Sequence, residues 1–166
     1  MRMVDTIVQE FDQEAPITRK VLERVPLDKK DWKPHTRSTS LGNLAAWLAN
    51  APGFTAKMMH TDGLDVGNWE SFPVPVSTSA LLSTFDQGCN AARAALAKLD
   101  DSAAVGAWNF RMGGKTLNTM PRIAFTRLFL LSDAIHHRGQ MSVYLRLLEV
   151  MVPAIYGPSA DDNPYF

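Results

Sequence analysis

Apolar residues recur at steps of three and four along most of the chain, and this spacing places them on one face of an α-helix. In the first such stretch they are Val4, Ile7, Phe11, Ala15, Leu22 and Val25. The predicted helices cover residues 3–24, begin at residue 41, run from the hydroxyl cluster at 77–79 to Leu99, and lie between Pro121 and Pro153. Because such helices bury their apolar faces against one another, the pattern predicts a four-helix bundle.

Helix-breaking residues interrupt this pattern at several points. Pro16 removes one backbone donor inside the first predicted helix, so we expect a bend or a break near residues 12–16. Pro52 and the glycine after it predict an end or a kink in the second helix. Residues 61–76 are rich in Gly, Asp and Pro and show no period, which predicts a loop.

The boundaries of the second and last helices carry more specific signals. Thr39 or Ser40 is expected to cap the second helix. A Gly113-Gly114 pair between short alternating runs predicts a small β-hairpin before the last helix. The last helix then opens with "IAFTRLFLL", which is apolar nearly all round and calls for cover from two neighbours or a second subunit.

Length and charge narrow the class of protein. A chain of 166 residues with 46% apolar and 20% charged residues predicts a single globular domain over residues 1–166. Seventeen basic and seventeen acidic side chains cancel, which argues against a nucleic-acid partner. Neither a signal peptide nor an apolar run of roughly 20 residues is present, so we expect a cytoplasmic protein without a membrane segment. Cys89 is the only cysteine and is expected in the core, so a bound metal would need nitrogen and oxygen ligands.

The stretch "DAIHHRGQ" in the last predicted helix places polar side chains on a face that is otherwise apolar. His137 falls within the stripe that also contains Ala134, Met141 and Tyr144, and Asp133 and Gln140 lie one turn to either side. A carboxylate and an imidazole four residues apart can hold one metal ion together. They can equally form a hydrogen-bonded ion pair that lets both be buried, and the spacing alone leaves both interpretations open.

A glycine and two arginines in this helix lead to further expectations about its contacts. Gly139 is unfavourable inside a helix, so we expect another part of the chain to approach its backbone closely. Arg138 and Arg146 could both reach the carboxylates of "SADD" near the C-terminus, although a solvated helix face also accounts for them.

Three segments together resemble the DinB-like, or DinB/YfiT, group of proposed metalloenzymes. They are "VLERVPLDKKDWKPHTRS", "SLGNLAAWLANAPGF" and "HHRGQMSVYLRLLEVMVPAIYGPSADD", and the resemblance covers nearly the whole chain. It implies a four-helix bundle, commonly a homodimer, in which three histidines hold a divalent metal, typically nickel or zinc. One histidine comes from the second helix and two, four residues apart, from the last. Some relatives are thiol S-transferases or amidohydrolase-like enzymes.

This sequence departs from the family pattern at two of the three metal positions. His137 matches the third family histidine, Asp133 stands where the second would be, and Trp47 stands where the first would be. An aspartate can still coordinate a metal, whereas an indole cannot, and it would instead offer its N–H to a neighbour such as Asp133. We therefore expect a degenerate metal site in a pocket formed by Trp47, Asp133, His137, Gln140 and Tyr144.

Two functions remain open at this stage. In one, Asp133, His137 and an unidentified third ligand hold nickel or zinc, and the protein is a metal-dependent thiol transferase or hydrolase. In the other, the bundle is free of metal and keeps the pocket for a small-molecule ligand or acts as a homodimeric partner protein. DNA binding is a third possibility, which the neutral overall charge argues against.

Overall fold

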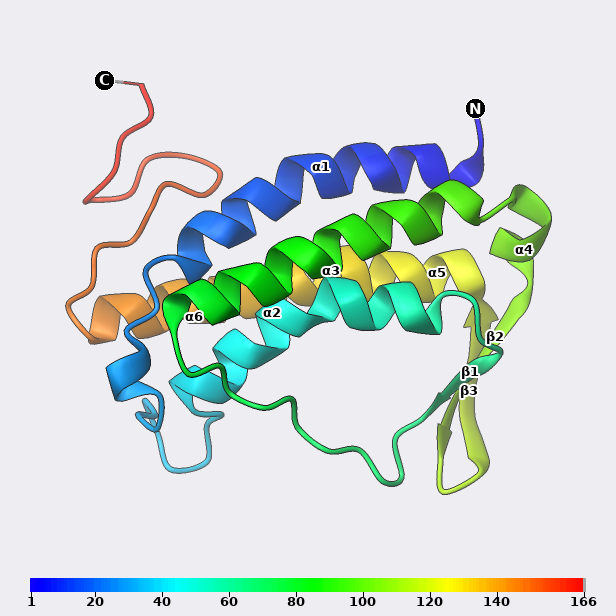
Figure 1. The fold of residues 1–166 in the computed structure, drawn as a ribbon, viewed down its shortest axis with the longest axis horizontal. Coiled ribbons are helices and arrows are strands. Elements are labelled where there is room, and N and C mark those ends of the chain that lie inside the picture. Colours follow the sequence, from blue (N-terminus) through cyan, green and yellow to red (C-terminus); the bar gives the residue numbers. More distant parts are fainter. Residues whose placement is uncertain (166) are drawn as a thin grey trace.

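The computed structural model describes residues 1–165 as long helices that lie side by side, with a small sheet near one end (Figure 1). In chain order the elements are α1 (Met3–Leu22), the 3-10 turn η1 (Leu27–Lys29), α2 (Leu41–Met58), β1 (Gly63–Asp65), α3 (Thr78–Lys98), α4 (Asp101–Val105), β2 (Ala107–Met112), β3 (Lys115–Pro121), α5 (Arg122–Arg127), the π-helical segment η2 (Leu128–Ser132) and α6 (Asp133–Leu147). The protein is thus mostly helical with a three-stranded sheet, which confirms the predicted fold class to that extent.

The first long helix, α1, continues through Pro16 without a break and ends at Leu22 rather than at residue 24. The missing donor of a proline removes a single hydrogen bond, and here the proline lies on the exposed side of the helix. Phe11, Ala15 and Thr18 are buried on the opposite side. Because those contacts flank the proline in sequence, packing holds the helix together across it.

The second long helix, α2, begins as predicted and ends later than predicted. The Ser40 hydroxyl accepts the Asn43 N–H at 3.3 Å, which confirms the expected cap. The helix does not end at Pro52 but runs to Met58. Gly53, the residue after Pro52, lies against Gly88 of α3. A Cβ added to Gly88 would stand 2.8 Å from the Gly53 nitrogen. The Pro-Gly pair therefore marks a close approach of two helices rather than a terminus.

The last helix is not uniform, because the π-helical segment η2 separates α5 from α6. A π turn adds one residue to a turn and so rotates every later side chain relative to the pattern set by α5. In α6 the buried residues are Arg138, Met141, Tyr144 and Leu145. His137, predicted to point inward, therefore lies half-buried at the edge of that face, and Arg138 occupies the core.

The sheet has the order β1-β2-β3, with β1 parallel to β2 and β2 antiparallel to β3. The predicted hairpin is confirmed, and its Gly113 and Gly114 have φ angles of 57° and 80° that favour glycine. Residues 61–76 are not loop throughout, because β1 lies within them. The Asp65 carboxylate accepts the N–H groups of Gly67, Gly113 and Gly114 at 2.8, 2.9 and 2.6 Å, which ties this segment to the hairpin.

A buried ion pair attaches the C-terminal segment to the helices. Arg138, 1% exposed, contacts the Glu14 carboxylate at 2.6 Å and donates to the Tyr156 hydroxyl at 2.6 Å. Arg146 pairs with Asp161 at 2.6 Å, which confirms the predicted contact between this arginine and a carboxylate of "SADD". The solvated-face interpretation is therefore wrong for Arg138, since an unpaired buried guanidinium would be strongly unfavourable.

Two other expectations concern single residues of the helices. Cys89 is buried, as predicted, and burial raises the pKa of its thiol to about 12, so it is not a reactive nucleophile. Within residues 1–165, no atom of another segment lies within 4 Å of a Cβ built on Gly139, so the expected close approach there is wrong. Among residues 1–165, the helices are all too short or too polar to cross a membrane.

Candidate ligand cleft around Trp47, Asp133 and His137

The indole of Trp47 reaches from α2 to the first residue of α6. Its Nε1–H donates to Asp133 Oδ2 at 2.6 Å, which confirms the contact suggested by the sequence. The other carboxylate oxygen, Asp133 Oδ1, lies 3.4 Å from His137 Nε2. Both oxygens of the carboxylate therefore face groups of the protein itself.

The surroundings of His137 favour its protonated form. Its Nδ1 lies 2.7 Å from Oε1 of Gln140, and an amide oxygen at this distance favours a proton on Nδ1. Its Nε2 faces the Asp133 carboxylate, which favours a proton there as well. The hydrogen bond to Asp133 accordingly raises the pKa of His137, and burial opposes this rise only in part.

Asp133 shows the reciprocal effect. Burial alone would raise the pKa of its carboxyl group, but the hydrogen bonds from His137 and Trp47 together outweigh burial and hold the pKa below its ordinary value. At neutral pH the group is therefore a carboxylate that faces two protein groups, the Trp47 N–H and the His137 ring. The three side chains form a connected polar cluster on the wall of the cleft.

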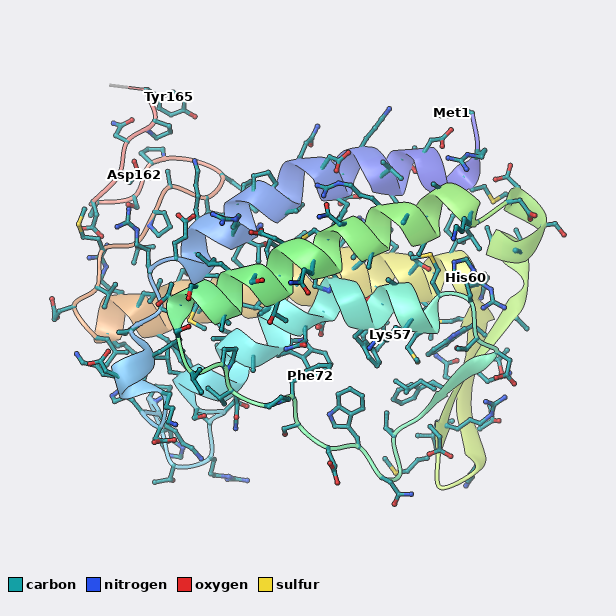
Figure 2. All side chains as sticks on the ribbon, in the orientation of Figure 1. Met1, Lys57, His60, Phe72, Asp162 and Tyr165 are labelled. Atoms are coloured by element: carbon teal, nitrogen blue, oxygen red, sulfur yellow. The ribbon has the colours of Figure 1, made fainter. Side chains whose placement is uncertain are left out.

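Aromatic rings surround the outer side of this cluster. The Trp47 ring lies 5.9 Å from that of Trp69, 5.6 Å from Phe72 and 6.0 Å from His137, and Phe54 completes the group at 5.2 Å from Trp69. Figure 2 labels Phe72 beside α2, on the segment that joins β1 to α3. The rings meet at tilted or edge-to-face angles, which stabilise aromatic clusters.

Two adjoining cavities share Trp47 and Trp69 in their walls. The first, of about 350 Å³, is partly polar and is lined by Lys33, Thr39, Ser40, Asn43, Leu44, Trp47, Trp69, Ser71, Phe72 and His137. The second, of about 360 Å³, is apolar and is lined by Trp47, Phe54, Leu64, Val66, Trp69, Phe110 and Phe129. Apolar walls with a few polar groups are typical of small-molecule sites.

The predicted pocket residues lie near one another but differ in their roles. Gln140 binds the outer nitrogen of His137. Tyr144 is buried beneath the cleft, and its hydroxyl donates at 3.1 Å to the carbonyl of Thr39, which lines the polar cavity. Sequence reasoning missed Trp69 and Phe72, although two large aromatic residues within a loop rich in Gly, Asp and Pro were a signal.

The donor set does not fit a three-ligand divalent metal centre. Within residues 1–165 there is no group of three or more His, Cys, Asp or Glu side chains that could hold an ion. Trp47 stands at the expected position of one ligand, and an indole offers no lone pair for a metal. Both nitrogens of His137 and both oxygens of Asp133 already have partners.

Comparison with known proteins identifies the family of this chain. The model of the DinB family matches residues 1–164, and the chain belongs to the DinB family. It is 28% identical over 160 residues to the uncharacterized protein YrdA of Bacillus subtilis (strain 168), covering 96% of this chain and 91% of YrdA.

Solved structures show the same fold. A DinB-like protein from Bacillus cereus superposes with a TM-score of 0.73 at 21% identity, covering 92% of this chain and 97% of that one. The DinB-like protein YjoA from Bacillus subtilis gives a TM-score of 0.67 at 18% identity, covering 95% and 99% of the two chains.

Proposed function

We propose that this DinB-family protein binds a small molecule in the aromatic cleft without a divalent metal. The observation that carries the proposal is the 2.6 Å hydrogen bond from Trp47 Nε1 to Asp133 Oδ2. It joins the two positions at which this chain departs from the three-histidine pattern. The indole both occupies the place of one ligand and uses an oxygen that a metal would need.

The fold supports the same proposal. Helices α1, α2 and α3 and the α5–α6 run lie side by side, which supports classifying the chain as a DinB-type four-helix bundle (Figure 1). In bundles, ligand sites are built from side chains on facing helices. Here α2 supplies Trp47, α6 supplies Asp133 and His137, and the segment before α3 adds Trp69 as an outer wall.

The alternative, a metal-dependent thiol transferase or hydrolase, needs a third donor beside Asp133 and His137. The described part of the chain supplies none in a suitable group. It also needs His137 in its neutral form, because an imidazolium has no free lone pair, whereas the contacts with Gln140 and Asp133 favour the protonated form.

Metal analysis of protein purified without a histidine tag tests the proposal directly. We expect no stoichiometric nickel or zinc and no change in Tm on adding a chelator, because a metal that binds only the folded state would stabilise it. The double variant Trp47→His, Asp133→His serves as the positive control and should acquire nickel or zinc, with a Tm that then falls on chelation.

Binding of the neutral apolar dye N-phenyl-1-naphthylamine tests the cleft itself. Its fluorescence should rise with the unmodified protein in the presence of chelator, and Trp69→Ala should weaken the response. Stoichiometric metal in the parent protein, or dye binding that disappears on chelation, would overturn the proposal.

A further inference from the structure

The apolar cavity lies where four parts of the chain meet. Its walls come from α2, from the sheet, from η2 and from the segment after β1, and they consist of Trp47, Phe54, Leu64, Val66, Trp69, Phe110 and Phe129. The sheet lies beside the C-terminal end of α2 (Figure 1). The volume of about 360 Å³ falls near the lower end of the range found for small-molecule pockets, so the cavity suits a compact ligand.

The rings that line this cavity are not part of the buried core. Each of the seven lining side chains keeps some of its surface exposed, and Trp69 is 39% exposed. In contrast, Trp108 and Phe125, the aromatic pair beneath them, are 0% exposed. Apolar surface in contact with water is unfavourable, so a ligand that covered these rings would complete their burial.

The floor and one wall of the cavity are held in place by the rest of the structure. Phe129 lies 5.0 Å from Phe125, which stacks on Trp108 at a centroid distance of 3.7 Å and an angle of 14°. The backbone N–H of Val66 donates to the carbonyl of Arg111 in β2 at 2.9 Å. Because these groups are already ordered, a ligand that binds here has little conformational entropy to remove.

No ionisable side chain lines the apolar cavity among residues 1–165. The N–H of Trp47 is already used by Asp133 at 2.6 Å. Asp133 and His137 face each other at 3.4 Å, and neither belongs to the cavity wall. A charged group placed in the cavity would lose its water without gaining a partner of opposite charge, so the walls favour an uncharged ligand.

Five of the seven lining side chains are aromatic, and their rings meet at steep angles. The Phe54 ring makes an angle of 80° with that of Trp69 and 59° with that of Phe129, and the two tryptophan rings meet at 70°. Such walls present both ring faces and ring edges. A flat aromatic ligand can therefore make edge-to-face and offset contacts that a saturated ring of the same size cannot make.

We propose that the apolar cavity binds a small, uncharged, flat aromatic molecule, which lies against Phe54, Phe110 and Phe129 with Trp69 as the exposed wall. This inference rests on the proposed function, because it names the chemical class of the ligand and assigns that ligand to one of the two adjoining cavities. The polar cavity takes no part in recognising the ring.

Four compounds of similar size test the chemical class. 2-Naphthol and decahydro-2-naphthol are uncharged at pH 7, whereas 2-naphthoate is an anion and 2-naphthylmethylamine a cation. Isothermal titration calorimetry with chelator present measures their Kd values. We expect 2-naphthol to bind roughly tenfold more tightly than its saturated analogue, since only the flat ring gains the aromatic contacts. It should also bind roughly tenfold more tightly than either ion, because the ions must be desolvated.

Two variants and a matched control locate the ligand. Phe110→Leu keeps an apolar wall but removes a ring, and it should weaken 2-naphthol about fivefold while leaving the saturated analogue unchanged. Val66→Phe fills the cavity and should abolish binding of both. Phe72→Leu is the control, because Phe72 lies 5.6 Å from Trp47 but lines only the polar one of the two cavities, and its Kd values should match those of the parent. Circular dichroism verifies that each variant is folded.

The outcomes separate this inference from the proposed function. Equal affinities for 2-naphthol and its saturated analogue, or an ion that binds as tightly as 2-naphthol, would show that the ligand class is wrong while binding in the cleft stands. A loss caused by Phe72→Leu in place of Phe110→Leu would move the ligand to the polar cavity, and unchanged binding in Val66→Phe would likewise overturn the assignment. If none of the four compounds and no neutral dye binds, the proposed function fails and this inference fails with it.

Discussion

Trp47→Phe isolates the hydrogen bond on which the metal-free interpretation depends. The substitution keeps an aromatic ring among Phe54, Trp69 and Phe72 but deletes the N–H that donates to Asp133 at 2.6 Å. A hydrogen bond to a charged group stabilises by about 1.5–3 kcal/mol. Because the Asp133 side chain is 26% exposed, water can replace part of the lost bond, and we expect a loss of about 1–2 kcal/mol.

Urea unfolding followed by circular dichroism at pH 7 measures this loss, and a decrease in Tm of about 2–8 °C should accompany it in a chain of this size. Trp69→Phe is the matched control. Trp69 lies in the same cleft, and its indole nitrogen has no hydrogen-bond acceptor among the described residues. Equal losses for the two variants would show that the bond to Asp133 adds nothing, and the argument for a polar cluster in place of a metal would fail.

Three other substitutions test separate parts of the structure. The Asp133–His137 pair should stabilise most between the ordinary pKa values of the two groups, about 3.8 and 6.5, because the stabilisation is lost as the pH falls through the lowered pKa of Asp133 or rises through the raised pKa of His137. Urea unfolding at pH 6 and pH 8 should therefore show a smaller loss on the alkaline side for His137→Gln than for the parent. Glu14→Ala should lower the free energy of unfolding by about 3 kcal/mol, since it leaves the buried Arg138 cation without its carboxylate, and a loss below about 1 kcal/mol would show that water reaches this group. Asp65→Asn should speed hydrogen exchange at the two hairpin glycines, because an amide has one accepting oxygen where the carboxylate uses two for three N–H groups; unchanged NMR exchange rates would contradict this.

Local chemistry explains why several elements were predictable from the chain alone. The cap at Ser40 and the hairpin at Gly113-Gly114 follow from hydrogen bonding and backbone freedom within a few residues. Burial of Cys89 follows from helical periodicity, which persists along α3 without interruption. The contact between Trp47 and Asp133 could be predicted because the family resemblance placed both residues at one site.

Periodicity was less exact about how deeply single residues of α6 are buried. The buried face of α6 comprises Arg138, Met141, Tyr144 and Leu145, so Arg138 is buried and His137, one position before it, lies at the edge of the core. The three residues of β1 were too few for a sequence pattern, and that strand forms because Asp65 and the hairpin hold it.

By itself the sequence determined the positions of the long helices, the hairpin and the polar strip, because each of these depends on residues within one or two turns of one another. Only the tertiary structure decided which groups the polar strip contacts. Lys33, Trp69 and His137 are more than thirty residues apart from one another in the chain, and folding brings them to one cavity. The 2.6 Å distance from the Trp47 ring nitrogen to the Asp133 carboxylate likewise depends on how two separate helices pack, which local sequence does not encode.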